Sequence, residues 1–389
     1  MARGHEKVAD GADIASVFWR LAINEGFGKE TGSQRATSVR LFCFVTGVQR
    51  VDEIRQHHLS GFRDALALFP KHFMRSASDG TKMVEEIMQQ ARFKPSEKRG
   101  IHVTTRQRHI TSIELLLERA ASEGQVLDPS LNIKKVKPKA KGKGAKHKQR
   151  AVFSTGELKR VFAHSLWQGA KSEGRRHEPG PVIVRDCRYW IPILLAYTGA
   201  RRAEIAGLES GDIREIGGHP CIVIQANQYR TIKGEEPGET DERYKKTRVV
   251  PIHPHLVELG LLEYALEMKG CRENLLFPDV VPKPRKGSRR AAAPDPALMV
   301  DKFGESIDYM WRKSVEAALE GNPKKLCMHS MRHRVINSFL FESDVLDAVR
   351  FDLVGHLKSE SEDTNTSVYR GEAPIDLQVA AINQLPRLF

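Results

Sequence analysis

The sequence predicts a mainly helical protein with one small antiparallel sheet, divided into two domains. Three observations support this prediction. The chain has 389 residues, which is enough for two ordinary domains. A strongly basic run, 134–150, interrupts it. Helical spacing of apolar residues dominates on both sides of this run, and only two short segments are rich in β-branched residues. We therefore place a helical domain at 1–133, a linker at 134–150 and a second domain at 151–389.

The first domain is predicted to be all helical. Segments Asp13 to Asn24 and Ser38 to Phe44 favour helix, and a third helix is expected to be capped by Thr104 or Thr105 and to end before Gly124. The apolar residues on one face of this third helix are Ile110, Ile113, Leu117 and Ala121.

The linker contains nine Lys or Arg residues, and Pro138, Gly142 and Gly144 predict that it lacks regular structure. Its basic residues are Lys134, Lys135, Lys137, Lys139, Lys141, Lys143, Lys146, Lys148 and Arg150. Such a run suits a polyanionic partner, although a solvated spacer is the alternative.

The second domain is expected to begin with a helix near Thr155, because Ser154 and Glu157 form a capping box. A long apolar helical stretch, Tyr189 to Gly207, is interrupted by Pro192 and by the Thr198–Gly199 turn. Two strands are predicted at Cys221–Gln225 and Thr247–Ile252. The acidic segment Gly234–Glu242 lies between them, 283–296 is expected to be a loop, and the chain is mostly helical again from Lys302 onward.

Composition narrows the class of protein. The net charge of +13 and the isoelectric point near 9.5 favour a polyanionic ligand. No apolar run is long enough to span a membrane, and the first residues lack the apolar core of a signal peptide. Five scattered cysteines without CxxC spacing suggest reduced thiols and no zinc site, so we expect a cytoplasmic protein.

Four short motifs carry residues suited to phosphate chemistry. The first is Thr-Gly-Ala-Arg-Arg-Ala-Glu, 198–204, in which Arg201 presents a planar fork that matches two phosphate oxygens and Glu204 follows one helical turn later. A structural Arg–Glu pair is the alternative, and Arg202 is a rival for the phosphate role. The second motif is His-Ser-Met-Arg-His, 329–333, in which His329 and Arg332 share a helical face.

The third motif is Gly355–His356, and the fourth is Tyr369 within Thr-Ser-Val-Tyr-Arg-Gly-Glu. A phenol can serve as a nucleophile when nearby positive charge favours its phenolate or a neighbour takes its proton. Ordinary packing roles for His356 and Tyr369 are the alternatives. A metal site built from His329, His333 and His356 is disfavoured, because no carboxylate or cysteine is suitably spaced.

The order of these motifs resembles that of the tyrosine recombinases, the phage-integrase family. The resemblance implies that Arg201 and Arg332 hold the scissile phosphate, that His329 and His356 assist, and that Tyr369 is the nucleophile. It implies a helical DNA-binding domain and a catalytic domain that clamp double-stranded DNA, with the linker along the DNA backbone. It also implies a homotetramer on DNA and chemistry that needs neither a cofactor nor a metal.

The family also places a lysine in a hairpin turn, where it protonates the leaving 5′ oxygen. We favour Lys233, because Ile222 to Lys233 resembles the family's first hairpin strand, and we retain Lys245 and Lys246 as alternatives. The gap of 13 residues between His356 and Tyr369 is slightly longer than is usual in the family.

In the tail from Ile375 to Leu385, the apolar residues Ile375, Val379 and Ile382 lie along one helical side. The resemblance implies that this tail docks on a neighbouring protomer, and packing on its own domain is the alternative. Two other functions stay open: a type IB topoisomerase, and a catalytically silent basic DNA-binding protein of the same fold. Within the recombinases, the sequence does not choose among integration, transposition and resolution.

Overall fold

The computed structural model describes residues 12–27, 29–70, 73, 83–95, 99–138, 151–230, 232, 247–270, 274–281, 305–355 and 372–389. The chain divides into two compact units, Met1–Lys148 and Gln149–Phe389. Each has its own apolar core.

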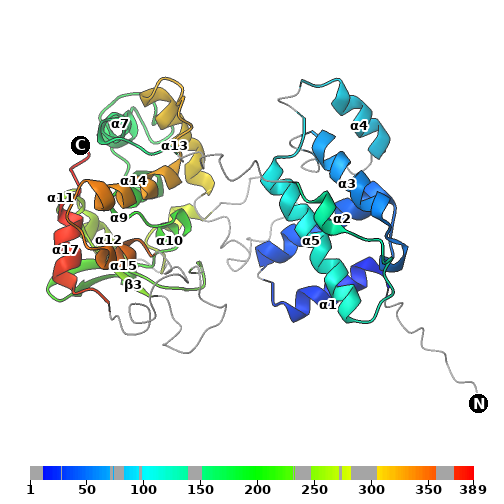
Figure 1. Cartoon of the computed structure of the whole chain (residues 1–389). Helices are drawn as coiled ribbons and strands as arrows, with labels where there is room; N and C mark the ends of the chain where they lie inside the picture. Colours follow the sequence, from blue (N-terminus) through cyan, green and yellow to red (C-terminus); the bar gives the residue numbers. More distant parts are fainter. Residues whose placement is uncertain are drawn as a thin grey trace, which may run out of the picture. The chain divides into compact units, whose positions relative to one another are not determined.

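Helices are the regular elements in the described residues of the N-terminal unit, which also contain isolated bridges (Figure 1). Its helices are α1 (Ile14–Asn24), α2 (Lys29–Thr46), α3 (Gln56–Leu68), α4 (Val84–Arg92), α5 (Val103–Ser122) and α6 (Ile133–Val136), with a 3₁₀ turn η1 (Val51–Glu53). The Asp13 side chain caps α1 by accepting from the Ser16 amide. The edge-to-face pair of Phe42 and Phe62 lies in the core, where α2 packs on α3 and α5.

Helix α5 agrees with the predicted helix and corrects its details. Ile110, Ile113 and Leu117 are buried as expected, but Ala121 is exposed. Leu116 and Ala120 complete the buried face instead, because three-residue and four-residue steps alternate along the stripe, which brings it to 120 rather than 121. The cap is His102, whose ring accepts from the Thr104 amide, rather than Thr104 or Thr105.

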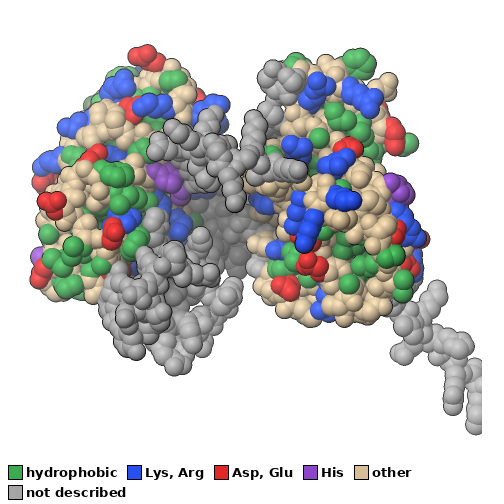
Figure 2. Space-filling view, in the orientation of Figure 1, with side chains coloured by type: hydrophobic (Ala, Val, Ile, Leu, Met, Phe, Trp, Pro, Cys, Tyr) green, Lys and Arg blue, Asp and Glu red, His purple; other side chains and the backbone are tan. Residues whose placement is uncertain are grey.

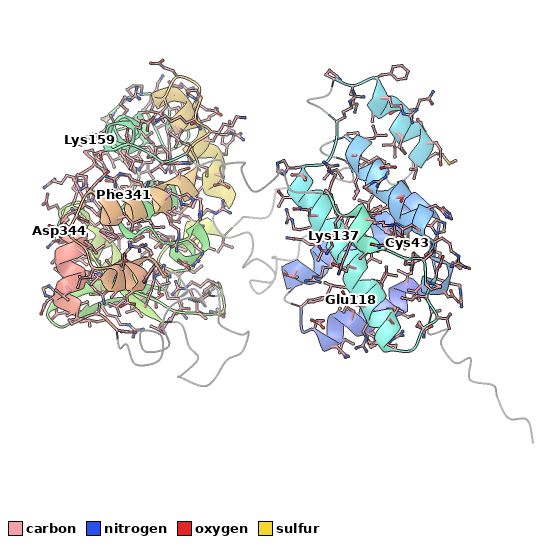
Figure 3. All side chains as sticks on the ribbon, in the orientation of Figure 1. Cys43, Glu118, Lys137, Lys159, Phe341 and Asp344 are labelled. Atoms are coloured by element: carbon pink, nitrogen blue, oxygen red, sulfur yellow. The ribbon has the colours of Figure 1, made fainter. Side chains whose placement is uncertain are left out.

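The start of the predicted linker also differs from expectation. Lys134 and Lys135 lie in α6, whose Val136 is buried in the core of the N-terminal unit. Lys137 lies beside α5, and its Nζ is 2.5 Å from Glu114 Oε2 (Figure 3). These residues are therefore fixed by apolar packing and an ion pair, which the basic composition concealed. The remaining basic linker residues, 139–150, lie outside the described residues.

The second unit combines helices with a three-stranded antiparallel sheet (Figure 1). Before the sheet come α7 (Thr155–Phe162), α8 (Ser165–Gln168), α9 (Cys187–Thr198), α10 (Arg202–Ala206) and a 3₁₀ turn η4 (Ser210–Asp212). After it come α11 (Pro254–Glu258), α12 (Leu261–Gly270), a 3₁₀ turn η5 (Pro278–Val280), α13 (Glu305–Ala318), α14 (Met328–Phe341), α15 (Asp347–Val354) and α17 (Ile375–Asn383). The capping box of Ser154 and Glu157 at α7 is confirmed, and Pro192 lies inside α9 without ending it.

The sheet has the order β1 (Ile213–Ile216), β2 (His219–Ile224), β3 (Arg248–Pro251). The predicted pairing of the last two strands is confirmed, with Ile222 opposite Val250. Strand β1 escaped prediction because charged residues occupy its middle and both are exposed. The expected continuation of the first strand to Lys233 is wrong: β2 ends at Ile224, and a turn closed by the Asn227–Arg230 bridge follows.

The tail packs on its own unit, which is the alternative given above to docking on a neighbouring protomer. Helix α17 packs on α15 and β3 (Figure 1). Ile382 and Leu385 are buried in the unit's core, together with Leu388. Ile375 and Val379 are only partly buried, so the predicted apolar side of the helix is shifted towards Ala381 and Ile382.

Candidate active site

The turn after α9 brings the first motif against the second. Gly199 ends α9 in the left-handed conformation, with φ of 61°, and a Cβ at this position would lie 3.1 Å from Val335 of α14. Its carbonyl accepts a hydrogen bond of 2.7 Å from Arg332 Nη1. Glycine is therefore required twice, by its backbone conformation and by the close approach of α14.

Arg201 and Glu204 form the predicted pair at the start of α10. The Arg201 amide donates to Glu204 Oε2, and Arg201 Nη1 lies 2.7 Å from Glu204 Oε1. The Glu204 side chain is 2% exposed and that of Arg201 is 30% exposed, so the carboxylate is buried while the guanidinium reaches the surface. This geometry leaves the outer edge of Arg201 available to an anion.

Glu204 holds a second arginine that the sequence analysis missed. Arg248, the first residue of β3, places Nη2 2.6 Å from Glu204 Oε2. Burial raises the pKa of the Glu204 carboxyl, but the charge and hydrogen bond of Arg248 and the hydrogen bonds from Arg201 outweigh it and lower this pKa to about 2. Glu204 is therefore ionised at neutral pH and bridges Arg201 and Arg248.

Arg332 completes a group that we call the arginine cluster, formed by Arg201, Arg248, Arg332 and Glu204. Arg332 is 4% exposed, and among the described residues its Nη2 has no hydrogen-bond partner. Burial, followed by the charges of Arg201 and Arg248, lowers its pKa to about 10. The guanidinium stays charged at neutral pH, so three positive groups face one carboxylate.

His329 lies one turn before Arg332 on α14 and is exposed. Its ring meets that of His333 edge-to-face, with centroids 4.8 Å apart. Of the two residues predicted to share a helical face, His329 is therefore exposed to solvent near the start of α14, and Arg332 is buried in the arginine cluster.

Gly355 brings the third motif to the arginine cluster. It ends α15 with φ of 62°, and a Cβ there would collide with Arg248 Nη1. The backbone of Gly355 therefore lies against the guanidinium that holds Glu204. His356 itself lies outside the described residues, as do Tyr369 and all three candidate lysines, Lys233, Lys245 and Lys246.

A second buried ion pair fixes the chain that leads from β2 towards Lys233. Arg230 is fully buried, and its Nη2 lies 2.9 Å from Asp212 Oδ2. Its Nη1 donates to the Glu204 carbonyl, and its Nε donates to the Gln225 carbonyl. Arg230 thus ties the β2–β3 connection to α10, the helix that carries Glu204.

Arg202, the rival for the phosphate role, forms an ion pair with Asp308 of α13. The adjacent arginines therefore have different partners, Glu204 for Arg201 and Asp308 for Arg202.

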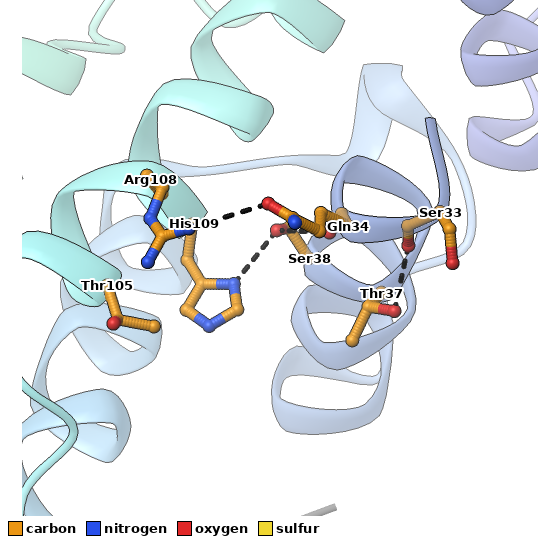
Figure 4. Close-up of a pocket in the computed structure, with 7 residues that line it drawn as sticks. All are labelled: Ser33, Gln34, Thr37, Ser38, Thr105, Arg108 and His109. Carbon is orange, nitrogen blue, oxygen red and sulfur yellow. Dashed lines mark hydrogen bonds between the residues drawn. The ribbon is translucent and has the colours of Figure 1, made fainter. Parts of the chain in front are cut away.

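The N-terminal unit carries a polar groove between α2 and α5, which we call the α2–α5 groove (Figure 4). It is lined by Ser33, Gln34, Thr37, Ser38, Thr105, Arg108 and His109. Arg108 Nη1 donates to Gln34 Oε1, and His109 Nδ1 lies 2.8 Å from Ser38 Oγ. A neighbouring hollow extends it along the same helices with Thr31, Arg35, Thr104, Gln107, Thr111 and Ser112. Figure 2 also shows several Lys and Arg patches on the visible face of this unit.

Within the described ranges, no group of three or more His, Cys, Asp or Glu side chains could hold a metal ion. None of the described helices is long and apolar enough to cross a bilayer.

The fold of the chain is similar to that of solved structures. The structure aligns with that of XerH site-specific recombinase bound to a palindromic difH substrate, with a TM-score of 0.52 and 14% identity over 89% of this chain and 78% of that chain. The chain has the fold of the tyrosine recombinases. A lambda integrase tetramer bound to a Holliday junction aligns at a TM-score of 0.47, with 12% identity over 94% of this chain and 85% of that chain. No protein-family model matches the sequence, and no curated protein matches it.

Proposed function

We propose that this chain is a site-specific DNA recombinase that cleaves and rejoins DNA strands through a 3′-phosphotyrosine intermediate. The observation that carries the proposal is the arginine cluster. Arg201 and Arg248 share a single carboxylate, their charges lower the pKa of the nearby Arg332, and Arg332 Nη2 has no partner among the described residues. An anion bound there would relieve the repulsion among the arginines and satisfy this donor, which suits a phosphodiester.

In the proposed reaction, the Tyr369 oxygen attacks the phosphorus in line and the bond from phosphorus to the 5′ oxygen breaks. The phenol loses its proton to a neighbouring base, for which His329 and His356 are candidates, and Lys233 gives a proton to the leaving 5′ oxygen. Arg201 and Arg332 stabilise the charge that develops on the non-bridging oxygens. A 5′-hydroxyl from a partner strand then attacks the phosphotyrosine and frees Tyr369, so no cofactor or metal is required.

Described residues flank each of the groups that lie outside the described residues. Gly355 touches Arg248 and directly precedes His356, while Arg230 anchors the connection that leads to Lys233. Tyr369 lies between α15 and α17, and both of these helices pack in the same unit. We propose that these three segments meet at the arginine cluster.

Double-stranded DNA is the proposed partner, with four protomers assembled on paired recombination sites in the cytoplasm, at the nucleoid. The α2–α5 groove offers hydroxyls, amides and Arg108, the groups that bind phosphates and base edges. The basic residues from Lys139 to Arg150 would lie along the DNA backbone and add salt-dependent affinity.

The proposal is tested with a DNA duplex that is nicked near the cleavage site, so that the covalent complex accumulates. The wild-type protein should give a covalent band on a denaturing gel in the presence of EDTA, and Tyr369→Phe should give none while binding DNA normally. Tyr309→Phe is the matched control, because Tyr309 is another late tyrosine and its ring is exposed. A covalent band from Tyr369→Phe would refute the assignment of the nucleophile.

A second assay separates the recombinase from a type IB topoisomerase. Exchange of strands between two labelled duplexes is expected of the proposed enzyme. Relaxation of supercoiled DNA without any exchanged product would favour the topoisomerase instead.

A further inference from the structure

The segment after α17, residues 385–389, is seated in a buried network of two histidines and a tyrosine. The Leu388 amide donates to the Tyr197 hydroxyl at 3.1 Å, and His253 Nε2 donates to the Leu385 carbonyl at 2.9 Å. Leu385 and Leu388 are buried, and the Phe389 ring packs on His255 and Phe162. The segment is therefore held by backbone hydrogen bonds as well as by apolar burial.

The network requires a neutral His253. Its Nδ1 accepts from the His255 amide, so its single ring proton lies on Nε2, where the Leu385 carbonyl accepts it. The Tyr197 and His253 rings stack with centroids 4.4 Å apart, and the Tyr197 hydroxyl lies 2.6 Å from His255 Nδ1. A second proton on His253 would lie on Nδ1, where it would oppose the amide proton of His255, so this hydrogen bond would be lost.

This network lies directly beside the arginine cluster in the sequence. Tyr197 is in the last turn of α9, two residues before the Gly199 carbonyl that accepts from Arg332 and four residues before Arg201. Gly199 is also wedged against Val335 of α14. A displacement of Tyr197 would therefore move the backbone that carries Arg201 and the carbonyl that orients Arg332.

We propose that residues 385–389, docked on their own unit, position the arginine cluster, and that Tyr197, His253 and His255 are the positioning residues that transmit their docking to the Gly199 turn. The inference rests on the proposed function for its effect on cleavage. The docking itself is independent of that function.

The docked state should weaken in acid. Burial is the main cause that lowers the pKa of His253; the Arg387 charge also lowers it, while the hydrogen bond to Leu385 and the Glu258 charge raise it. Burial likewise lowers the pKa of His255, the charges of Arg387 and His253 lower it further, and the Glu258 charge raises it. On the phenol side, burial raises the pKa of Tyr197 to about 12, with Arg334 among the nearby charges. Because the folded-state histidine values are depressed, the stabilisation is present above the ordinary histidine pKa and is lost as pH falls through the folded-state values.

The first test compares Tyr197→Phe with wild type in single-turnover cleavage at saturating DNA. This change removes one oxygen and keeps the ring, and we expect the cleavage rate to fall about tenfold while DNA affinity is unchanged, since a small misplacement of catalytic groups has effects of this size or larger. The control is Lys171→Ala, which breaks the exposed Lys171–Glu178 pair elsewhere in the same unit and should leave the rate near wild type. Normal cleavage by Tyr197→Phe, with the hydroxyl lost, would overturn the proposal.

The second test needs neither cleavage nor a variant that folds well. Hydrogen exchange of the full-length wild-type protein is followed from about pH 8 to about pH 5, corrected for the intrinsic pH dependence of exchange. Protection should fall together in residues 385–389 and in 198–203, while α12 stays protected. Release of 385–389 without any change in 198–203 would overturn the inference even if the protein cleaves DNA. If wild type makes no covalent complex but both segments respond together, the docking inference stands and the proposed function fails.

Discussion

The arginine cluster and the α2–α5 groove are both polar, but they are built in opposite ways. In the cluster, the side chains of Glu204, Arg248 and Arg332 are almost fully buried, and the charges are held by ion pairs and backbone contacts. In the groove, Gln34 and Arg108 are exposed and share one hydrogen bond of 3.4 Å. Buried charges with fixed partners are suited to one ligand group in one geometry. Exposed amides and hydroxyls can adapt to different base edges.

This comparison predicts that changes in the cluster affect the rate of chemistry and that changes in the groove affect DNA binding. The largest effect is expected for Arg332→Ala, which removes a buried guanidinium that we propose binds the phosphate. Single-turnover cleavage should fall roughly a hundredfold or more, about 2.7 kcal/mol of transition-state stabilisation. Arg201→Ala should behave in the same way.

The matched control for Arg201→Ala is Arg202→Ala, which removes the adjacent arginine with the same change in net charge. Arg202 pairs with Asp308, so cleavage should stay within a few-fold of wild type. Equal losses from the two variants would indicate that general charge, rather than the geometry of the cluster, controls the rate.

The next largest effect concerns Lys233, the proposed general acid. Lys233→Ala should slow cleavage of a normal phosphodiester by about a hundredfold, the lower end expected for loss of a general acid, and should be rescued when the 5′-bridging oxygen is replaced by sulfur, because a thiolate leaves without protonation. The same pair of substrates is applied to Lys245→Ala and Lys246→Ala. If Lys245→Ala or Lys246→Ala is rescued and Lys233→Ala is not, the general acid is a residue at the other end of the β2–β3 connection.

A smaller loss is expected for Glu204→Gln, which keeps the shape of the side chain and removes its charge. We expect cleavage to fall about tenfold, because Arg201 and Arg248 lose the carboxylate that orients them. In the wild type, the lowered pKa of Glu204 means that its ionised form stabilises the folded state. This stabilisation is present above the ordinary carboxylate pKa and is lost as pH falls through about 2. The Glu204 contribution should therefore stay constant from neutral pH to mildly acidic pH, and a pH dependence that disappears in Glu204→Gln would contradict this.

The smallest effect is expected in the groove. Arg108→Ala should weaken DNA binding about threefold to tenfold and lower the slope of affinity against salt by about one, if this side chain contacts a phosphate. Cleavage at saturating DNA should be unchanged. Lys159→Ala, on α7 of the other unit, is a control for loss of one surface charge (Figure 3). A loss of cleavage rate with Arg108→Ala would contradict the prediction that the groove affects DNA binding and the cluster affects the rate of chemistry.

The sequence by itself determined the features that depend on neighbours along the chain. The capping box at Ser154, the turn at Thr198–Gly199 and the apolar face around Ile113 are local patterns, and each appears where it was predicted. The order of the motifs indicated the recombinase fold, which the aligned XerH structure supports. The roles of Tyr369 and the lysines stay predictions.

The tertiary structure decided the features that depend on contacts between distant segments. Arg248 looked like one more charged residue in a strand, and only the approach of α10 and α15 reveals that it holds Glu204 and meets Gly355. The docking of the tail on its own unit also follows from the position of Tyr197 and His253, far away in the sequence. Local propensity cannot encode such pairings, because a buried charge or carbonyl finds its partner only after the chain has folded.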